Sequence, residues 1–414
     1  MERFYDVAVM GAGPSGLAAA ITVKMMSPDL SVVILEKKEK PAKKLRASGN
    51  GRGNLSNEKC DDLESVLWFF SQVGIAVRMD DEGRIYPYSE EAEAVAQTLV
   101  DRAAGLGVKI LLNSRVKDAK ADLKGGFRIF ISEKDGYESC LKCRSFLIAS
   151  GGKSFAAYGS SGDGYSLARS FGHQVTSLIP GLTAIEVKED ISSLKGVRAK
   201  GEVRLFDNGD LKFREKGEIQ FREDSISGIC VMNLSSALPA ASSADMKKEA
   251  FAYLRISINL APDWDAAGLV DFLRLKQQFK GAAAADMLET IVKKPLAHML
   301  LAKNGLDEKK HASGLSAAYI VNLANGIRNF SLTPIGLKGW KEAQVTKGGV
   351  ALDSVCSSTM ESLLVKDLYF AGEVLDYDGP CGGFNLHNAW LTGIKAGRAI
   401  AQKLQPKSVA EEGI

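Results

Sequence analysis

The chain has 414 residues with 53 basic and 50 acidic side chains, so its formal net charge is only +3. With 45% hydrophobic and 25% charged residues it has the composition of an ordinary globular protein, which excludes a disordered chain or a fibrous repeat. The near balance of charge argues against a protein whose main function is to coat nucleic acid. The length allows about two to three domains.

Cysteine content and hydropathy bear on where the protein works. Six cysteines are too few for a disulfide framework in a chain of this length, which favours a reducing compartment. No apolar segment approaches the ~20 residues of a membrane span, and Glu2 and Asp6 stand where a signal peptide would not carry acidic residues. We expect a soluble cytoplasmic protein. Nothing in the sequence indicates an oligomeric state.

The N-terminal region carries the pattern of strand, glycine turn, helix and second strand. The predicted strand Tyr5–Met10 is followed by GAGPSG at 11–16 and by the Ala-rich, helix-forming segment Leu17–Met25. A second strand is predicted over Ser31–Leu35 and leads into Glu36. In this setting GAGPSG matches the G-x-G-x-x-G fingerprint of dinucleotide-binding folds.

Each part of this motif has a chemical role. Gly11, Gly13 and Gly16 permit a tight turn and the close approach of a pyrophosphate, whose charge the helix N-terminus stabilises. Glu36 can accept hydrogen bonds from ribose hydroxyls, and its charge disfavours a 2′-phosphate. The motif therefore predicts FAD or NAD rather than NADP, without choosing between the first two.

The remaining elements divide the chain into an α/β part and an inserted segment. The α/β part has predicted helices over Leu63–Val73, Ala92–Gly105 and Asn385–Leu404, a helix capped by Asp163 that stops at Gly172, and predicted strands over Val108–Leu112, Gly126–Ser132, Ser145–Ala149 and Leu368–Ala371. The insertion has predicted strands over Leu182–Val187, Val203–Phe206 and Glu218–Phe221 and helical composition over Pro239–Ala252 and Trp264–Lys303. We expect a dinucleotide-binding domain of residues 1–180 and 341–414, interrupted by a β-rich domain (181–258) and a helical domain (259–340).

Three further glycine turns, at 48–54, 149–164 and 379–383, favour FAD, because FAD is longer than NAD and needs more backbone to cover it. With AGE at 371–373 and GRIYPYS at 83–89, they make the chain resemble the bacterial NAD(P)/FAD-dependent oxidoreductases of the aminoacetone oxidase-like and 3-dehydro-bile acid reductase-like kind. The resemblance covers nearly the whole chain. It implies an α/β, Rossmann-like domain of glutathione-reductase type that binds FAD non-covalently.

The resemblance also implies a set of cofactor-binding residues. Those for the pyrophosphate and the adenosine are Gly11, Gly13, Ser15, Gly16, Glu36, Lys37 and, through its backbone, Val116. Those of the second glycine turn, facing the diphosphate, ribitol and flavin, are Lys44, Ser48, Gly49 and Asn54. The later turns contribute Ala149, Ser150, Gly151, Gly152, Gly372 and Glu373, and the flavin-facing loop contributes Gly382, Gly383, Asn385 and Leu386.

Departures from the family pattern lie near the expected flavin and concern the substrate more than the cofactor. Gly53 stands where Cys is common, Cys381 where Thr is common, and His387 where Gln is common. His387 is either a proton donor or a histidine at a helix start that only hydrogen-bonds to backbone. Tyr377 and Arg52, with Asp378, are the alternative acid or anion-binding groups, and the sequence does not decide among them.

Several patterns have simpler explanations. Cys140 and Cys143 form a C-x-x-C without a second one, at the start of a predicted strand, so neither a redox pair nor a metal site is expected. The basic run 37–46 could hold phosphate or RNA but is more typical of a solvated loop. Gly393 and Gly397 indicate close packing of the last helix on the sheet.

The sequence thus predicts an FAD-dependent oxidoreductase that transfers hydride through the flavin to or from a small organic molecule. NAD(P)H is the expected electron donor, and without a second nucleotide fingerprint it should dock transiently between the FAD and inserted domains. If the last helix of the protein points at the flavin, the N-terminus of that helix would stabilise negative charge on the reduced ring. The alternatives are a flavin-bound RNA-associated or redox-sensing protein and an NAD-only dehydrogenase, which a yellow protein would exclude.

Overall fold

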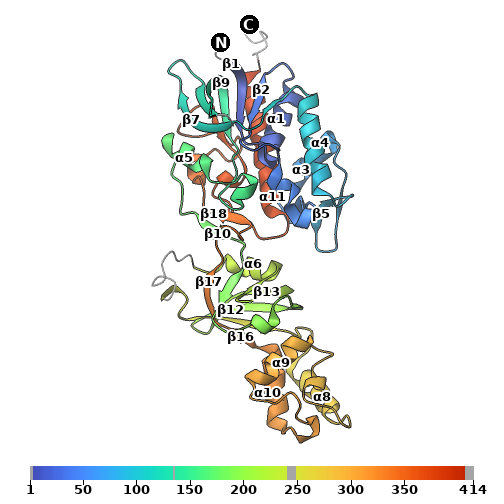
Figure 1. The fold of residues 1–414 in the computed structure, drawn as a ribbon. Helices are drawn as coiled ribbons and strands as arrows, with labels where there is room; N and C mark the ends of the chain where they lie inside the picture. The colour runs from blue at the N-terminus through green and yellow to red at the C-terminus, as the bar shows by residue number, and fades with distance from the viewer. Residues whose placement is uncertain (1–2, 134–135, 240–248, 406–414) are drawn as a thin grey trace, which may run out of the picture. The chain divides into compact units, whose positions relative to one another are not determined.

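The computed structural model describes residues 3–133, 136–239 and 249–405, and the chain divides into two compact units. The first unit joins both ends of the chain, Met1–Ile179 and Gln344–Ile414, and the second is Pro180–Ala343. Figure 1 shows the blue and red ends of the chain side by side within the first unit. Each unit has an apolar core built from its own residues. The finer division of the insertion at residues 258 and 259 stays a prediction.

A mixed sheet forms the centre of the first unit, in the order β6-β2-β1-β9-β8-β7. The first four strands run parallel, as does β19, which pairs with the last residues of β9, and β7 and β8 form an antiparallel extension. The carboxyl ends of the parallel strands therefore meet at one edge. The strands are β1 (Arg3–Met10), β2 (Val32–Leu35), β6 (Lys109–Leu111), β7 (Arg115–Ala121), β8 (Phe127–Ser132), β9 (Glu138–Ile148) and β19 (Leu368–Phe370).

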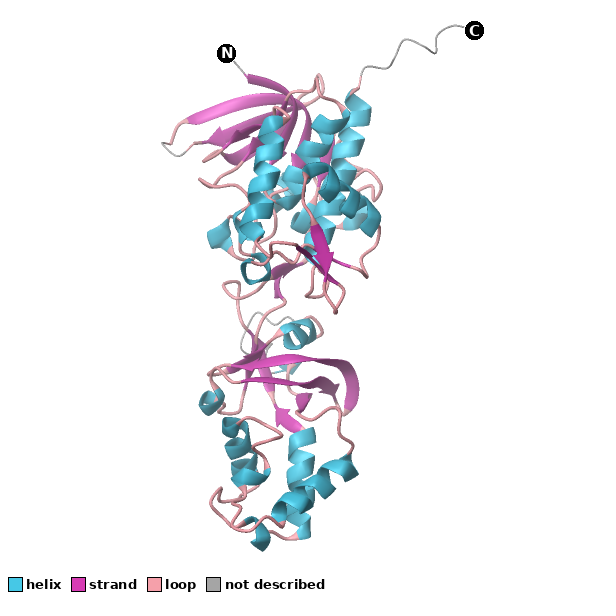
Figure 2. Ribbon diagram, turned by 90° about the vertical axis from the view of Figure 1, so that its right-hand side faces the viewer, coloured by secondary structure: helices cyan, strands magenta, loops and turns pink. Residues whose placement is uncertain are grey.

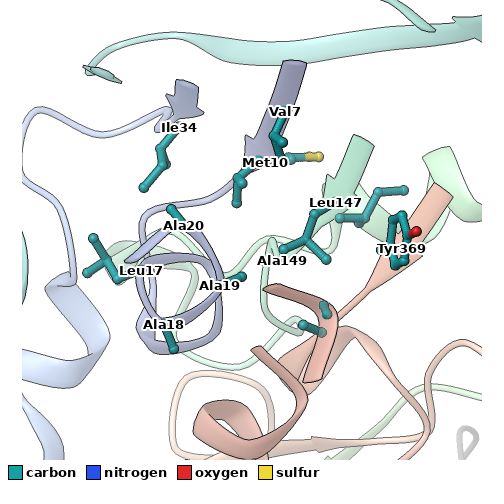
Figure 3. Packing of buried hydrophobic residues seen from close by; sticks show 14 of the residues in the cluster. Val7, Met10, Leu17, Ala18, Ala19, Ala20, Ile34, Leu147, Ala149 and Tyr369 are labelled. Atoms are coloured by element: carbon teal, nitrogen blue, oxygen red, sulfur yellow. The ribbon is translucent and has the colours of Figure 1, made fainter. Parts of the chain in front are cut away.

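Helix α1 (Pro14–Met26) lies buried between this sheet and α11 (Phe384–Leu404). Its Ala-rich sequence lets neighbours approach closely, and Figure 3 shows side chains of the strands, among them Ile34 and Leu147, gathered around its alanines. The two glycines that predicted close packing of α11 do face a near neighbour, but it is α1 rather than the sheet. A Cβ on Gly393 would lie 2.4 Å from the Ser15 carbonyl oxygen.

Smaller elements complete the first unit, and two of its helices have the bounds that the sequence predicts. They are α2 (Lys43–Arg46), α3 (Leu63–Val73), α4 (Ala92–Gly105), α5 (Asp163–Ser170), and a small sheet of β3 (Ser56–Asn57), β5 (Arg84–Pro87) and β4 (Val77–Met79). β10 (Ile179–Gly181) and β18 (Val345–Lys347) are the segments in which the chain leaves this unit and returns. The predicted cap of α5 is wrong: its N-cap is Gly162, and no side chain caps it.

Strand β9 begins earlier than predicted, so Cys140 and Cys143 lie within it rather than at its start. Cys143 is buried, and burial raises the pKa of its thiol far above the ordinary value. Because only a thiolate is a nucleophile or a metal ligand, burial of Cys143 disfavours both kinds of chemistry at that residue.

The second unit consists of a seven-stranded antiparallel sheet in the order β16-β15-β12-β13-β14-β11-β17 and a group of helices, seen in Figures 1 and 2. The strands are β11 (Ile185–Val187), β12 (Arg198–Asp207), β13 (Asp210–Phe221), β14 (Ser225–Ser227), β15 (Leu254–Asn259), β16 (Phe330–Leu332) and β17 (Pro334–Leu337). The helices are α6 (Ile229–Ser235), α8 (Ala266–Gln277), α9 (Lys294–Lys303) and α10 (Ala317–Arg328). In the described part of the chain, no helix is long and apolar enough to cross a membrane.

Two expectations for the second unit need correction. The helical segment predicted over Trp264–Lys303 is two helices, because α8 ends at Gln277 and Pro295 begins α9 anew. Helix α10, which Ser316 caps by accepting from the amide of Tyr319, was not predicted. The helix predicted over Pro239–Ala252 lies mostly outside the described residues.

Candidate functional site

The glycine turn after β1 lies at the edge where the parallel strands end, and its glycines differ in what surrounds them. A Cβ on Gly11 would lie 2.6 Å from the Ala149 carbonyl oxygen, and one on Gly16 only 2.0 Å from the Gly11 carbonyl oxygen. A Cβ on Gly13 would meet no protein atom within 4 Å. Gly11 and Gly16 are thus required by packing, whereas Gly13 faces open space at the N-terminus of α1, where an anion is favoured.

Glu36 lies beside this turn and holds it. One carboxylate oxygen accepts from the Ala12 amide and the other from the Lys38 amide, each at 2.9 Å. A narrow pocket opens here, and it brings together five of the sequence-predicted residues: Gly11, Glu36, Lys37, Val116 and Ser150. The remaining lining residues are Met10, Leu35, Ser114, Arg115, Gly159 and Asp163.

Asp163 is a residue of this pocket that the sequence assigned to helix capping. Its carboxylate forms ion pairs with Lys37 at 2.7 Å and Arg115 at 2.8 Å. Burial alone would raise the pKa of Asp163, but the hydrogen bonds from these two cations lower it from its ordinary value. The positive charge of Lys37 is therefore balanced by the Asp163 carboxylate. The pairing joins residues far apart in the sequence, so no local pattern could have indicated it.

The later glycine turns close against the first one. Gly372 has a φ of +78°, and a Cβ there would lie 2.5 Å from the Ser15 hydroxyl oxygen. Its amide donates to the Thr392 hydroxyl at 2.9 Å, which ties this turn to α11. Ala149 follows β9, and Gly151 beyond it takes a φ of +72°. The turns at both ends of the chain thus form one surface.

Glu373 is the centre of a second polar cluster. The Lys44 ammonium group lies 2.6 Å from one of its carboxylate oxygens, and the other accepts from the Thr346 amide at 2.8 Å and the Ser154 hydroxyl at 3.1 Å. Gly152 lies against this cluster, since a Cβ there would be 2.3 Å from the Thr346 hydroxyl oxygen. Lys44, Gly152 and Glu373 are sequence-predicted, but Ser154 and Thr346 were missed because their contacts with Glu373 form only in the tertiary fold.

The second glycine turn contains two buried polar atoms without a partner. The Ser48 hydroxyl oxygen and the Asn54 side-chain carbonyl oxygen make no hydrogen bond in the structure. Gly49 between them takes a φ of +58°. Because leaving a buried polar atom unpaired costs about 1–3 kcal/mol, both oxygen atoms would gain from a hydrogen-bond donor bound at this turn.

The loop before α11 is held by the helix that follows it. The Asn385 side chain accepts from the Gly379 amide at 2.9 Å and donates to the Gly379 carbonyl at 2.8 Å. Gly382 and Gly383 both have positive φ, and no side chain caps the helix, so its first amides stay available to an anion. Leu386, in contrast, packs against the apolar core.

His387 is buried, and both of its ring nitrogens contact the protein. Nε2 donates to the Asp61 carbonyl at 2.7 Å, so in the neutral ring Nδ1 accepts from the Ser56 hydroxyl at 2.9 Å. Burial lowers its pKa from the ordinary value, which favours this neutral form. Of the two roles that the sequence left open, this geometry favours that of a hydrogen-bonding histidine.

The other candidate acids and anion-binding groups lie elsewhere in the first unit. Burial raises the pKa of both the Tyr377 phenol and the Asp378 carboxyl group, so both are protonated to higher pH than usual. Arg52 lies over the Tyr86 ring, 4.9 Å from its centroid, and lines a different cavity from the pocket at Glu36.

Known proteins resemble this chain over nearly its whole length. Residues 61–399 match the family of the HI0933-like protein Rossmann domain. A 3-dehydro-bile acid delta(4,6)-reductase of Clostridium scindens is 32% identical over 96% of this chain and 99% of its own. A ribosomal RNA dihydrouridine synthase of Haemophilus influenzae is 26% identical over 97% and 100%.

One solved structure shows the same fold at low sequence identity. The 3-ketosteroid delta1-dehydrogenase of Sterolibacterium denitrificans superposes with a TM-score of 0.51, at 12% identity, over 97% of this chain and 100% of its own. The family match, the full-length relatives and the glycine turns agree. The chain belongs to the HI0933-like family, and with it to the FAD-dependent oxidoreductases that its glycine turns resemble.

Proposed function

We propose that the first unit binds FAD non-covalently along the edge formed by its glycine turns. Three observations support this: the open space at Gly13, the pocket at Glu36, and the unpaired buried oxygens of Ser48 and Asn54. Together they run from the first turn to the second, which suits an extended dinucleotide better than a single phosphate. The unpaired oxygens carry the proposal, because the protein itself offers them no partner.

Bound FAD would supply the hydride chemistry, and the chain's residues would position it. Glu36 would exchange part of its backbone contact for ribose hydroxyls, while Asp163 keeps the charge of Lys37 paired. The free amides at the N-terminus of α11 would stabilise negative charge nearby, as in an oxyanion hole. His387 is neutral and hydrogen-bonded at both ring nitrogens. It would hold Ser56 and Asp61, which follow the second glycine turn, against α11 rather than transfer a proton.

The reaction would be reduction of a carbon–carbon double bond conjugated to a carbonyl group in a small organic molecule, with NAD(P)H as donor. The names of the two full-length relatives support this class, because a 3-dehydro-bile acid delta(4,6)-reductase and a dihydrouridine synthase both saturate such a bond.

Anaerobic titration of the yellow protein with NADH and with NADPH tests the donor. Bleaching by one and recolouring by a conjugated enone are expected; no bleaching by either would contradict it.

Action on RNA is the second candidate, favoured by the dihydrouridine synthase relatives. The basic run 37–46 gives it limited support, because Lys37 and Lys44 are paired with the largely buried carboxylates of Asp163 and Glu373. A phosphate-binding surface needs cations that are free to replace counterions. Binding to ribosomal RNA that weakens steeply with salt, together with flavin oxidation by that RNA, would favour this candidate over a small molecule.

A further inference from the structure

A cavity of about 210 Å³ lies beside the second glycine turn, and the proposed FAD site does not use it. Arg52 from that turn, Arg78 from β4, Tyr86 from β5 and Glu90 before α4 line it, with Met79 and two aspartates. It is smaller than the ~300 Å³ at which pockets for whole small ligands begin, so it suits an end group of a larger molecule.

Two guanidinium groups meet on one carboxylate in this cavity. Arg78 contacts one oxygen of Glu90, and Arg52 lies 3.8 Å from the other. That distance is too long for a hydrogen bond, and among the described residues the guanidinium group of Arg52 has only one further contact, with the Tyr86 ring. Since a guanidinium group carries five N–H donors, Arg52 keeps donors for another acceptor.

Glu90 combines a strained backbone conformation with ion pairs that are exposed to water. Its φ of +51° lies in the left-handed region that residues other than glycine rarely adopt. The side chains of Arg52, Arg78 and Glu90 are 52%, 48% and 35% exposed, and ion pairs exposed to this extent are weak. Asp80, in the same lining, is engaged by its own turn, because it accepts from the amides of Glu82 and Arg84.

We propose that this cavity binds an oxyanion, and that the Glu90 carboxylate holds the place of a ligand's phosphate or carboxylate group. Either group matches the planar donors of arginine, and Glu90 would turn out into water when displaced. The oxyanion has two possible sources, a phosphate of the nicotinamide donor or a carboxylate of the substrate. Only this assignment to donor or substrate rests on the proposed function; the oxyanion site itself does not.

The test is calorimetric titration of the purified protein, with its own cofactor bound, against adenosine 2′-phosphate and against benzoate. Glu90→Gln removes the competing charge and should bind its preferred anion about tenfold more tightly than the wild type. Glu82→Gln is the matched control, because Glu82 is an exposed carboxylate paired with Arg84 outside the cavity. Arg78→Ala should weaken binding about tenfold and gives an independent measure if Glu90→Gln folds poorly.

Preference for adenosine 2′-phosphate supports the site and assigns it to the donor, whereas preference for benzoate supports it and assigns it to the substrate. Equal affinities of the wild type, Glu90→Gln, Glu82→Gln and Arg78→Ala for both probes would overturn the proposal. If the purified protein binds no FAD even at saturating concentration, the proposed function fails, but the same four-way comparison still decides the oxyanion site.

Discussion

The three glycines of the first turn belong to one sequence motif, but the protein structure requires only two of them. Gly11 and Gly16 lie where a Cβ would collide with backbone oxygen atoms. Gly13 has no such neighbour, and its φ of −83° is open to any residue. Only Gly13 therefore reports on a ligand rather than on the fold.

Replacing Gly13 by Val should separate cofactor binding from stability. The new side chain would extend into the space assigned to the pyrophosphate, so FAD affinity should fall at least about tenfold, or ~1.4 kcal/mol. The melting temperature of the flavin-free protein should change by less than about 2 °C. Flavin absorbance per protein chain and thermal melts measure the two effects.

Gly16→Ala is the matched control for Gly13→Val. Its Cβ would overlap the Gly11 carbonyl oxygen, so the protein should lose about 1–3 kcal/mol of stability whether or not flavin is present. If Gly13→Val retained flavin as well as the wild type does, the pyrophosphate would not lie at this turn.

Two buried histidines of the first unit are held in the neutral form. The Ser354 hydroxyl donates to the Ala351 carbonyl, so it accepts from Nδ1 of His173, and Nε2 then accepts from Ser362. Burial lowers the pKa of His173, as it does that of His387. Protonation would put a second N–H against a hydroxyl that is itself donating, and would charge a buried ring.

Stability should therefore fall in acid. The unfolded chain takes up protons on these rings near pH 6.5 and the folded protein only at lower pH, so stability is present above that pH and lost as pH falls. The loss is at most ~1.4 kcal/mol per pH unit for each ring. Chemical denaturation between about pH 5 and 8 measures it, and His387→Gln should reduce the slope, unlike the exposed control His311→Gln. An unchanged slope in His387→Gln would show that this ring does not contribute.

At the scale of elements, the sequence predicts a helix or strand correctly where a single amphipathic or apolar segment determines it. The bounds of α3 and α4 and the position of β2 follow from hydrophobic spacing alone. The prediction that Asp163 caps α5 was wrong because its carboxylate forms ion pairs with Lys37 and Arg115, which lie far from it in the sequence. Likewise, the glycine turns indicated Lys44 and Glu373, but Ser154 and Thr346 join them only through the tertiary fold.

The close contact between α1 and α11 depends on glycine at position 397. A Cβ on Gly397 would lie 2.6 Å from the Ala19 carbonyl oxygen, so Gly397→Ala must push the two helices apart. We expect a loss of about 1–3 kcal/mol, measured by chemical denaturation. Gly105→Ala is the control, because a Cβ there meets nothing within 4 Å, and its stability should stay equal or rise slightly. Equal stability of both variants would mean that the helices can separate without cost.

At the scale of the whole molecule, the two units share neither core residues nor predicted cofactor residues. All of the buried apolar residues around α1 belong to the first unit, and every residue assigned to FAD lies there too. The chain leaves and re-enters this unit at neighbouring points, since the Thr176 amide donates to the Gly349 carbonyl at 2.9 Å. The second unit interrupts the first in sequence without interrupting its core.

Excision of residues 180–343 should therefore leave a folded flavoprotein. Residues 1–179 and 344–414, joined by a short Gly/Ser linker, retain the complete apolar core and all of the proposed FAD contacts. We expect cooperative unfolding and a yellow protein, because a loop closure between neighbouring ends costs little. Turnover of a conjugated enone should be lost if the second unit supplies substrate contacts, whereas bleaching by NAD(P)H should persist if the donor docks on the first unit alone. A joined first unit that folds but stays colourless, at saturating FAD, would place an essential flavin contact in residues 180–343 and overturn the assignment of the whole site to one unit.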